Sequence, residues 1–249
     1  MCPRALYNLA MEPSTAQRLV ELNRQFYAEF GAHFSATRQK IQPGVRKIIR
    51  ELNGAERILD LGCGNGELAR TLAETGFHGT YLGLDFSLPL LADAASQPGA
   101  FPVEFRAVDL SAQDWDSSLV TQQYSLITAF AVFHHLPSLA LRCELFRKIR
   151  GLLAPGGRFI HSNWQFLNSE KLKARIQPWS AAHLSAADVD PGDYLLDWRS
   201  GGTGLRYAHH FSELELSQLA AETGFRVVAS FLSDGANDRL GLYQIWEMA

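Results

Sequence analysis

The residues best suited to chemistry stand in one short glycine-rich segment, Asp60-Leu61-Gly62-Cys63-Gly64-Asn65-Gly66-Glu67. An apolar stretch that predicts a buried strand precedes this segment, and a helical pattern follows it. Glycines let a backbone approach a ligand closely and adopt positive φ, and the start of a helix offers free N–H groups. Asp85 closes the next expected strand, where a carboxylate can accept hydrogen bonds from ribose hydroxyls. The segment therefore predicts a site for a nucleoside-containing ligand.

The glycine spacing indicates which kind of ligand this is. The pattern is GxGxG, whereas dinucleotide-binding loops carry GxGxxG. Asp60 also stands two residues before Gly62, where its carboxylate would repel a pyrophosphate and attract a cationic amino-acid group. A nicotinamide cofactor is therefore disfavoured. The alternative is a tight strand-to-helix turn that binds nothing.

The surrounding pattern predicts an α/β fold built on a parallel sheet. Short apolar runs alternate with amphipathic helical patterns, as in right-handed β-α-β units. Strands are expected over residues 57–61, 80–85, 103–109, 124–131, 158–162, 226–232 and 242–246. Helices are expected over residues 43–52, 67–75, 88–96, 139–153 and 213–222, with a further one beginning near Ser14. The last two strands are joined directly and predict a hairpin, which places one antiparallel strand at the sheet edge.

Two regions lie outside this alternation. Residues 1–54 predict an N-terminal helical extension, which we interpret as a lid, ahead of the main domain at 55–249. Residues 165–205 contain several aromatic and glycine residues without clear periodicity, and we interpret them as an insertion after the fifth strand. The fold class is thus a doubly wound, mostly parallel, seven-stranded Rossmann-like sheet with an antiparallel edge strand and these two additions.

Composition excludes several classes of protein. The chain has 249 residues, a formal net charge of −3 and 47% hydrophobic residues, which is ordinary for a soluble globular protein. No apolar run approaches the ~20 residues needed to span a bilayer, so we expect no membrane partner and a cytoplasmic location. Positive charge is concentrated in the first fifty residues, and the chain as a whole lacks the strong basicity typical of nucleic-acid binders.

The glycine segment resembles the first motif of the class I S-adenosylmethionine-dependent methyltransferases, and the resemblance extends over about residues 55–165. It implies S-adenosyl-L-methionine as the cofactor. In that family Asp60 and the loop would bind the methionine end, Asp85 and the adjacent Phe86 the ribose, and Asp109 with Leu110 the adenine. The end of the fourth strand would line the methyl site. The cofactor residues that the resemblance implies are Asp60, Gly62, Cys63, Gly64, Asn65, Gly66, Asp85, Phe86, Asp109, Leu110, Ala129 and Phe130. We add Arg38, which would bind either the carboxylate of the cofactor or an anionic acceptor.

A narrower resemblance is to the tRNA wobble-uridine methyltransferases, which esterify 5-carboxymethyluridine in the anticodon. It rests on the segment from Phe26 to Arg38, on His134-His135-Leu136, and on the segment from Arg206 to Phe211. This family implies tRNA as the acceptor and, in its eukaryotic members, a small activator subunit. Many small-molecule methyltransferases share a tyrosine-rich helix before the core and a His-His-Leu turn, so a small acceptor stays open.

Three residues are candidates for the acceptor chemistry. A carboxylate acceptor is already deprotonated at pH 7 and needs a cationic clamp, for which Arg206 is our candidate. An acceptor hydroxyl or amine would instead need a base, and His135 stands after the fourth strand where that base is required. His209 is expected to line the acceptor pocket.

The sequence thus predicts a methyltransferase that acts on carboxymethyluridine in tRNA. The first alternative is a small-molecule O- or N-methyltransferase, and the second is a non-catalytic subunit that binds the cofactor. No metal site is expected, since the three cysteines are scattered and none stands at CxxC spacing.

Overall fold

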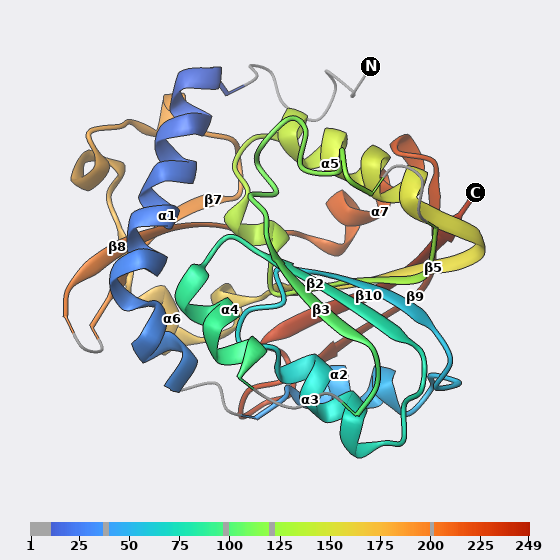
Figure 1. Ribbon diagram of the computed structural model, residues 1–249. Helices are drawn as coiled ribbons and strands as arrows, with labels where there is room; N and C mark the ends of the chain where they lie inside the picture. The colour runs from blue at the N-terminus through green and yellow to red at the C-terminus, as the bar shows by residue number, and fades with distance from the viewer. Residues whose placement is uncertain (1–10, 37–39, 97–99, 120–122, 200–201) are drawn as a thin grey trace.

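The computed structural model describes residues 11–36, 40–96, 100–119, 123–199 and 202–249. Within these residues, seven strands form one sheet in the order β3-β2-β1-β4-β5-β10-β9 (Figure 1). The strands are β1 (Arg57–Leu61), β2 (Thr80–Asp85), β3 (Val103–Ala107), β4 (Tyr124–Phe130), β5 (Leu153–Trp164), β9 (Phe225–Ser233) and β10 (Gly241–Met248). The order reverses between β1 and β4, and this switch point is where open α/β sheets bind ligands.

The predicted fold class is confirmed, with one correction to the position of the antiparallel strand. Strands β1 to β5 are mutually parallel, and β10 runs antiparallel to both β5 and β9. The antiparallel strand therefore lies one place inside the edge, and the edge strand β9 runs in the common direction. The hairpin causes this, because its second strand β10 pairs with β5 and leaves the first strand outside.

Helices cover both faces of the main sheet (Figure 1). Ile58 packs in the cluster formed with α2 (Pro43–Ile49) and α3 (Glu67–Glu74). The next residue, Leu59, packs in the cluster formed with α5 (Leu139–Leu152) and α7 (Glu213–Glu222). Successive side chains of a strand point to opposite faces, so β1 is buried on both sides and its sequence is apolar almost throughout. Helix α4 (Leu88–Ala95) follows β2.

The expected insertion contains a second sheet that the sequence did not predict. Its three antiparallel strands are β6 (Ile176–Gln177), β7 (Asp193–Trp198) and β8 (Gly204–His209), in the order β6-β7-β8. Two short helices, η2 (Phe166–Asn168) and α6 (Glu170–Lys173), connect β5 to β6. Two more, η3 (Trp179–Ala182) and η4 (Ala186–Asp188), connect β6 to β7. The small sheet extends to His209, four residues beyond the boundary that we expected.

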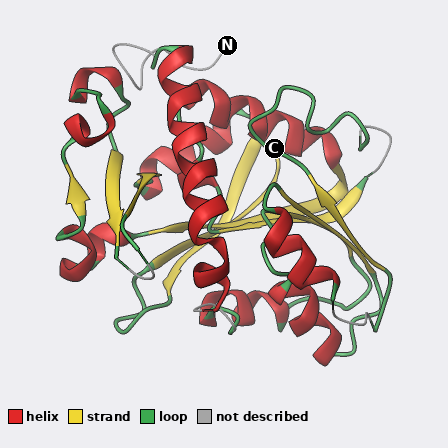
Figure 2. Ribbon diagram, turned by 60° about the vertical axis from the view of Figure 1, so that its left-hand side comes forward, coloured by secondary structure: helices red, strands yellow, loops and turns green. Residues whose placement is uncertain are grey.

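The long N-terminal helix α1 (Pro13–Ala36) lies against the small sheet and against α4 (Figure 2). Phe26 and Phe30 of this helix pack with Trp198 of β7. Leu19 packs with Tyr207 of β8. The apolar face that predicted the helix therefore covers the insertion as well as the core. No helix among the described residues is long and apolar enough to cross a membrane.

Candidate functional site

A cavity of about 340 Å³ lies at the carboxyl ends of β1, β2, β3 and β4. The loops that follow these strands form its floor, and α1 forms a wall. Ten of the predicted cofactor residues line it: Asp60, Gly62, Cys63, Gly64, Asn65, Asp85, Phe86, Asp109, Leu110 and Phe130. Parallel strands place their carboxyl ends at one edge of a sheet, which is why residues far apart in the sequence meet here.

The three loop glycines have different tasks. Gly62, Gly64 and Gly66 have φ of 70°, 55° and 76°, a region that side chains with a Cβ rarely adopt. A Cβ on Gly62 would lie 2.4 Å from the Val132 side chain, whereas one on Gly64 would meet nothing within 4 Å. Gly64 thus leaves the backbone open to a ligand. Gly66 does not line the cavity, and a Cβ there would lie 2.9 Å from Ala94, so this glycine lets α3 approach α4.

Asp60 lies at the end of β1 with only 3% of its surface exposed. One carboxylate oxygen accepts a hydrogen bond from the Tyr81 hydroxyl at 2.6 Å, and the other accepts one from the Thr128 hydroxyl at 2.7 Å. Burial raises the pKa of Asp60 to about 6, although both hydroxyls oppose the rise. A cationic group of a ligand would offset this cost, which fits the amino-acid end of S-adenosylmethionine.

Asp85 at the end of β2 is tied to the glycine loop. Its carboxylate accepts hydrogen bonds from the backbone N–H of Gly64 at 2.9 Å and from that of Ser87 at 2.8 Å. Burial raises the pKa of Asp85, and these N–H groups oppose the rise. Each oxygen keeps a lone pair for a further donor, so the site still fits ribose hydroxyls.

Asp109 after β3 forms an ion pair with Arg24 of α1. The Ser111 backbone N–H and hydroxyl both donate to its other oxygen. Burial favours the neutral acid, but these donors and Arg24 outweigh it and lower the pKa of Asp109. Arg24 was not among the predicted site residues, although the positive charge of the first fifty residues had pointed to that region.

The end of β4 provides one cavity residue instead of the two expected. Phe130 lines the cavity, whereas Ala129 is fully buried in the sheet core. Phe86 also lines the cavity and makes an edge contact with the Tyr27 ring at 5.8 Å between centroids. Arg38 lies outside the described residues.

His135 lies in the one-turn helix η1 (Phe133–His135) and lines the cavity. Its Nε2 lies 2.9 Å from the Tyr27 hydroxyl oxygen, and its Nδ1 lies 3.3 Å from the backbone oxygen of Tyr207. Tyr27 also lines the cavity and is 8% exposed. The structure therefore pairs His135 with Tyr27, which the sequence analysis mentions only as part of the segment from Phe26 to Arg38.

Arg206 does not line the cavity. It is 4% exposed, and its guanidinium carbon lies 4.5 Å from the centre of the Trp164 ring and 5.6 Å from those of Phe26 and Trp198. Trp164 does line the cavity. Arg206 thus stands behind a cavity wall, where it contacts the wall residue and not the space in which an acceptor would bind.

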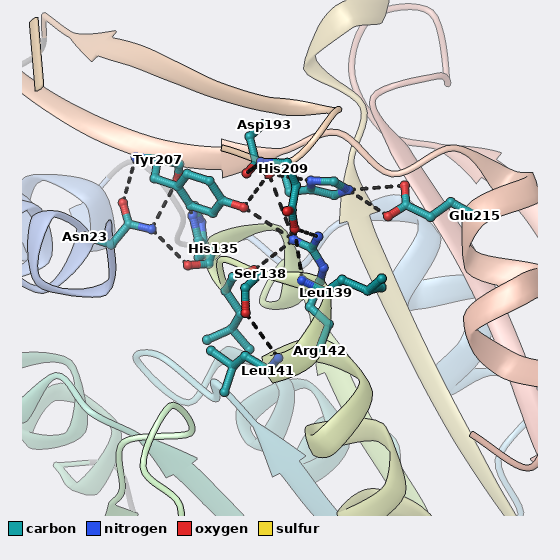
Figure 3. Close-up of polar contacts among 12 residues, drawn as sticks. Asn23, His135, Ser138, Leu139, Leu141, Arg142, Asp193, Tyr207, His209 and Glu215 are labelled. Carbon is teal, nitrogen blue, oxygen red and sulfur yellow. Dashed lines mark hydrogen bonds and ion pairs between the residues drawn. The ribbon is translucent and has the colours of Figure 1, made fainter. Parts of the chain in front are cut away.

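His209 also lies outside the cavity, fully buried in a cluster of charged residues (Figure 3). Its Nδ1 is 2.6 Å from Asp193, and its Nε2 is 2.9 Å from Glu215. The Tyr207 hydroxyl donates to the same Asp193 oxygen at 2.6 Å, and Arg142 lies 3.2 Å from Asp190. Since carboxylates contact both ring nitrogens, the ring has no free nitrogen for an acceptor. The sequence pattern gave no sign of this enclosure.

Further cavity residues escaped sequence reasoning because they come from separate elements. Asn23 and Arg24 come from α1, and Asp234 comes from the loop between β9 and β10. The Asp234 carboxylate accepts hydrogen bonds from the Gly44 backbone N–H at 2.9 Å and from the Tyr243 hydroxyl at 2.6 Å. Among the residues described, no group of three or more His, Cys, Asp or Glu could hold a metal ion.

Comparison with known proteins agrees with this geometry. The model of a family described as a methyltransferase domain matches residues 32–230. The ubiquinone biosynthesis O-methyltransferase of Aeromonas salmonicida (strain A449) is 33% identical over 103 residues, which cover 41% of this chain and 41% of that protein. The tRNA (carboxymethyluridine(34)-5-O)-methyltransferase of Macaca fascicularis is 26% identical over 166 residues, which cover 61% of this chain and 22% of that protein. Both matches span less than half of the relative's own length.

Solved structures share the fold. A SAM-dependent methyltransferase from Methanosarcina mazei superposes with a TM-score of 0.61 at 20% identity, covering 84% of this chain and 98% of that one. A glycopeptide N-methyltransferase complexed with S-adenosyl-L-methionine superposes with a TM-score of 0.58 at 18% identity, covering 84% and 93%. The cofactor predicted from the glycine loop is the one bound in that complex. The chain belongs to the methyltransferase-domain family and has the fold of the S-adenosylmethionine-dependent methyltransferases.

Proposed function

We propose that the chain methylates a hydroxyl group of a small, partly apolar acceptor bound beside Tyr27 and His135. The observation that carries this proposal is the 2.9 Å contact between the Tyr27 hydroxyl and His135 Nε2 at the cavity wall. A carbonyl oxygen only accepts hydrogen bonds, so the Tyr207 carbonyl holds the proton of the neutral His135 ring on Nδ1. The Nε2 lone pair then accepts the hydrogen bond from Tyr27.

This arrangement can remove a proton from an acceptor. S-adenosylmethionine supplies, when bound, a methyl group on a positively charged sulfur. The sulfur is the leaving group and keeps the bonding electron pair. The acceptor oxygen gives its proton to the Tyr27 oxygen while the Tyr27 proton moves to His135 Nε2. The acceptor oxygen then forms the new bond to the methyl carbon. Such positioned proton transfer typically contributes ~10²- to 10⁴-fold in rate. A carboxylate acceptor would need no such pair.

The charges around the cavity also favour a neutral acceptor. Among the described lining residues, the arginine and lysine side chains are Arg24 and Lys40. Arg24 is already paired with Asp109 and Glu21, and Lys40 is exposed. Apolar side chains such as Phe130 and Trp164 form much of the remaining wall. These features support a small, partly apolar molecule that carries a hydroxyl.

A carboxymethyluridine of tRNA is the second candidate. It is supported by the similarity to the tRNA methyltransferase of Macaca fascicularis and by the position of Arg206 directly behind Trp164. A turn of Trp164 would be required before Arg206 could bind the acceptor carboxylate. An activator subunit belongs to this candidate, and a cytoplasmic location remains our expectation for either.

Helix α1 would act as a lid in both cases. It contributes Asn23, Arg24 and Tyr27 to the cavity wall and forms the ion pair with Asp109 beside the expected adenine site.

Methyl transfer from labelled S-adenosylmethionine to two acceptor pools tests the proposal. One pool is bulk tRNA that contains carboxymethyluridine, and the other is an RNA-free extract of small metabolites. We expect label in the metabolite pool and its loss in the His135→Asn variant. Label in tRNA that mild alkali releases would establish the second candidate instead. Bound cofactor with no transfer to either pool would indicate a non-catalytic subunit or a missing activator.

A further inference from the structure

Asn23 lies in the middle of α1 and contacts two other parts of the fold (Figure 3). Its side-chain oxygen accepts a hydrogen bond from the Tyr207 backbone N–H at 2.8 Å. Its amide nitrogen donates to the Tyr207 carbonyl at 3.2 Å and to the His135 carbonyl at 3.0 Å. Only 5% of the residue is exposed. All the hydrogen-bonding groups of this side chain therefore serve Tyr207 and His135.

Asn23 supplies the hydrogen bonds that a neighbouring strand would give to Tyr207. Tyr207 lies in β8, which is an edge strand of the small sheet and pairs through this residue with Leu195 of β7. In an antiparallel pair, every second residue points both its N–H and its C=O away from the partner strand. Without Asn23 the Tyr207 N–H would lose the partner that it has here, and the C=O would be left with the contact to His135 Nδ1. One side chain of α1 thus completes the edge of the small sheet.

The carbonyl that Asn23 binds also faces the His135 ring. The Tyr207 carbonyl accepts from both Asn23 and His135 Nδ1, and Asn23 also holds the backbone carbonyl of His135. We propose that Asn23 is a positioning residue that fixes His135 as the Nδ1–H tautomer, with the Nε2 lone pair turned toward Tyr27. Its catalytic meaning rests on the proposed function, but the tautomer itself is measurable without turnover.

A second anchor of Tyr207 supplies a matched control. The Tyr207 hydroxyl donates to Asp193 at 2.6 Å and lies 3.3 Å from Arg142, on the side of the charged cluster (Figure 3). Tyr207→Phe removes these contacts but keeps the backbone carbonyl that faces His135. If the tautomer preference of His135 is lost in Asn23 variants but kept in Tyr207→Phe, the cause is the Asn23 contact and not a general loosening of β8.

The test is a ¹⁵N NMR spectrum of the histidine rings in the full chain, recorded at pH 8.5, two units above the ordinary histidine pKa of about 6.5. His135→Gln assigns the His135 signals among the eight histidines of the sequence. We expect a protonated Nδ1 and an unprotonated Nε2 at His135 in the wild type and in Tyr207→Phe. In Asn23→Ala the preference should be lost, so that the Nε2–H form gains at least half of the population.

Two results would overturn the proposal. One is an Nε2–H tautomer in the wild type, and the other is an unchanged Nδ1–H tautomer in a folded Asn23→Ala protein. If Asn23→Ala does not fold, Asn23→Asp keeps the size of the side chain but cannot donate to either carbonyl, and the same outcomes apply. His161 is an internal control, because its Nδ1 contacts Asn163 at 3.1 Å and Asn23 does not touch it. Failure of methyl transfer with the expected tautomer would count against the proposed function alone.

Discussion

At the scale of single residues, Asp60 is held where its surroundings oppose a negative charge. Its two hydroxyl donors satisfy the carboxylate, yet burial still raises its pKa to about 6. The residue therefore reports on cofactor binding, since a cationic ligand group beside it would favour the charged form.

This gives a pH dependence with a defined sign. As the pH falls through about 6, Asp60 takes up a proton and loses its attraction for the cofactor's ammonium group. We predict that the dissociation constant for S-adenosylhomocysteine rises up to tenfold per pH unit below 6, and that binding near pH 6 releases protons. Calorimetry in two buffers of different ionisation enthalpy measures both effects. In Asp60→Asn the dependence should vanish, and persistence of the full dependence would exclude Asp60 as its source.

The same carboxylate should reduce the stability of the cofactor-free fold. Its pKa is raised from an ordinary value of 3.8, so the native state holds the proton more tightly than the unfolded state does. The cost is absent below pH 3.8, grows between the two values and is complete above pH 6, at ~3 kcal/mol from the 1.36 kcal/mol per pKa unit. We predict that Asp60→Asn stabilises the free protein by up to about this amount at pH 8, measured by urea denaturation. A variant less stable than the wild type at pH 8 would contradict this account.

The residues of the cofactor loop were predictable because they lie in one continuous segment whose strand and helix are set locally. Tyr27, Arg24 and Asn23 were not, because their function depends on where α1 packs. Arg206 and His209 were proposed from a sequence resemblance, and burial in the small sheet separates both from the cavity. The local sequence determines the geometry of a continuous motif, whereas the geometry of an acceptor site built from separate elements depends on how those elements pack.

At the scale of elements, α1 is joined to the cofactor site by the ion pair of Arg24 with Asp109. Both side chains are partly exposed, at 43% and 34%, so the pair contributes at most about 1 kcal/mol. We predict that Arg24→Gln speeds dissociation of S-adenosylhomocysteine about two- to fivefold with little change in melting temperature, as stopped-flow and calorimetry would show.

Arg18 supplies the control for this prediction. It lies on the same helix, and its guanidinium donates to the Ala182 carbonyl, away from the cavity. Arg18→Gln should therefore leave the dissociation rate unchanged. Equal rates in the wild type and Arg24→Gln would remove the ion pair from the lid hypothesis.

The main sheet was predictable at the level of elements, but the small sheet was not. Strand β6 has two residues, and in β7 the neighbouring Leu195 and Leu196 are both fully buried. A strand buried on both faces shows no alternation, and a two-residue strand shows no period at all. The small sheet extends past the range of 165–205 that we expected for the insertion, and its strand order depends on tertiary packing.

At the scale of the whole molecule, a buried charged cluster joins three regions of the fold. Arg142 comes from α5, Asp193 from β7 of the small sheet and Glu215 from α7 (Figure 3). Asp190, in the segment just before β7, pairs with Arg142. His209 links Asp193 to Glu215. The cluster holds the insertion on the main domain, which is the role that we now propose for His209.

Arg142 is the cation on which this cluster depends. It is fully buried, and although burial lowers the pKa of its guanidinium, the surrounding Tyr207, Asp193, Glu215 and Asp190 raise that pKa on balance. We predict that Arg142→Met costs about 3–5 kcal/mol of unfolding free energy, because it leaves carboxylates buried without their partner. Chemical denaturation measures this. Arg147→Met, at an exposed position of the same helix, should cost less than about 0.5 kcal/mol.

The measurement that tests the account most directly is the single-turnover rate of methyl transfer by Tyr27→Phe, with labelled S-adenosylmethionine and the small-metabolite pool. This substitution removes one hydroxyl, which donates to His135 and faces the cavity. The account predicts that the cofactor dissociation constant stays within about twofold while the rate falls about 10²-fold or more. A rate equal to that of the wild type, with the same labelled product, would contradict the central claim that Tyr27 and His135 remove the acceptor proton.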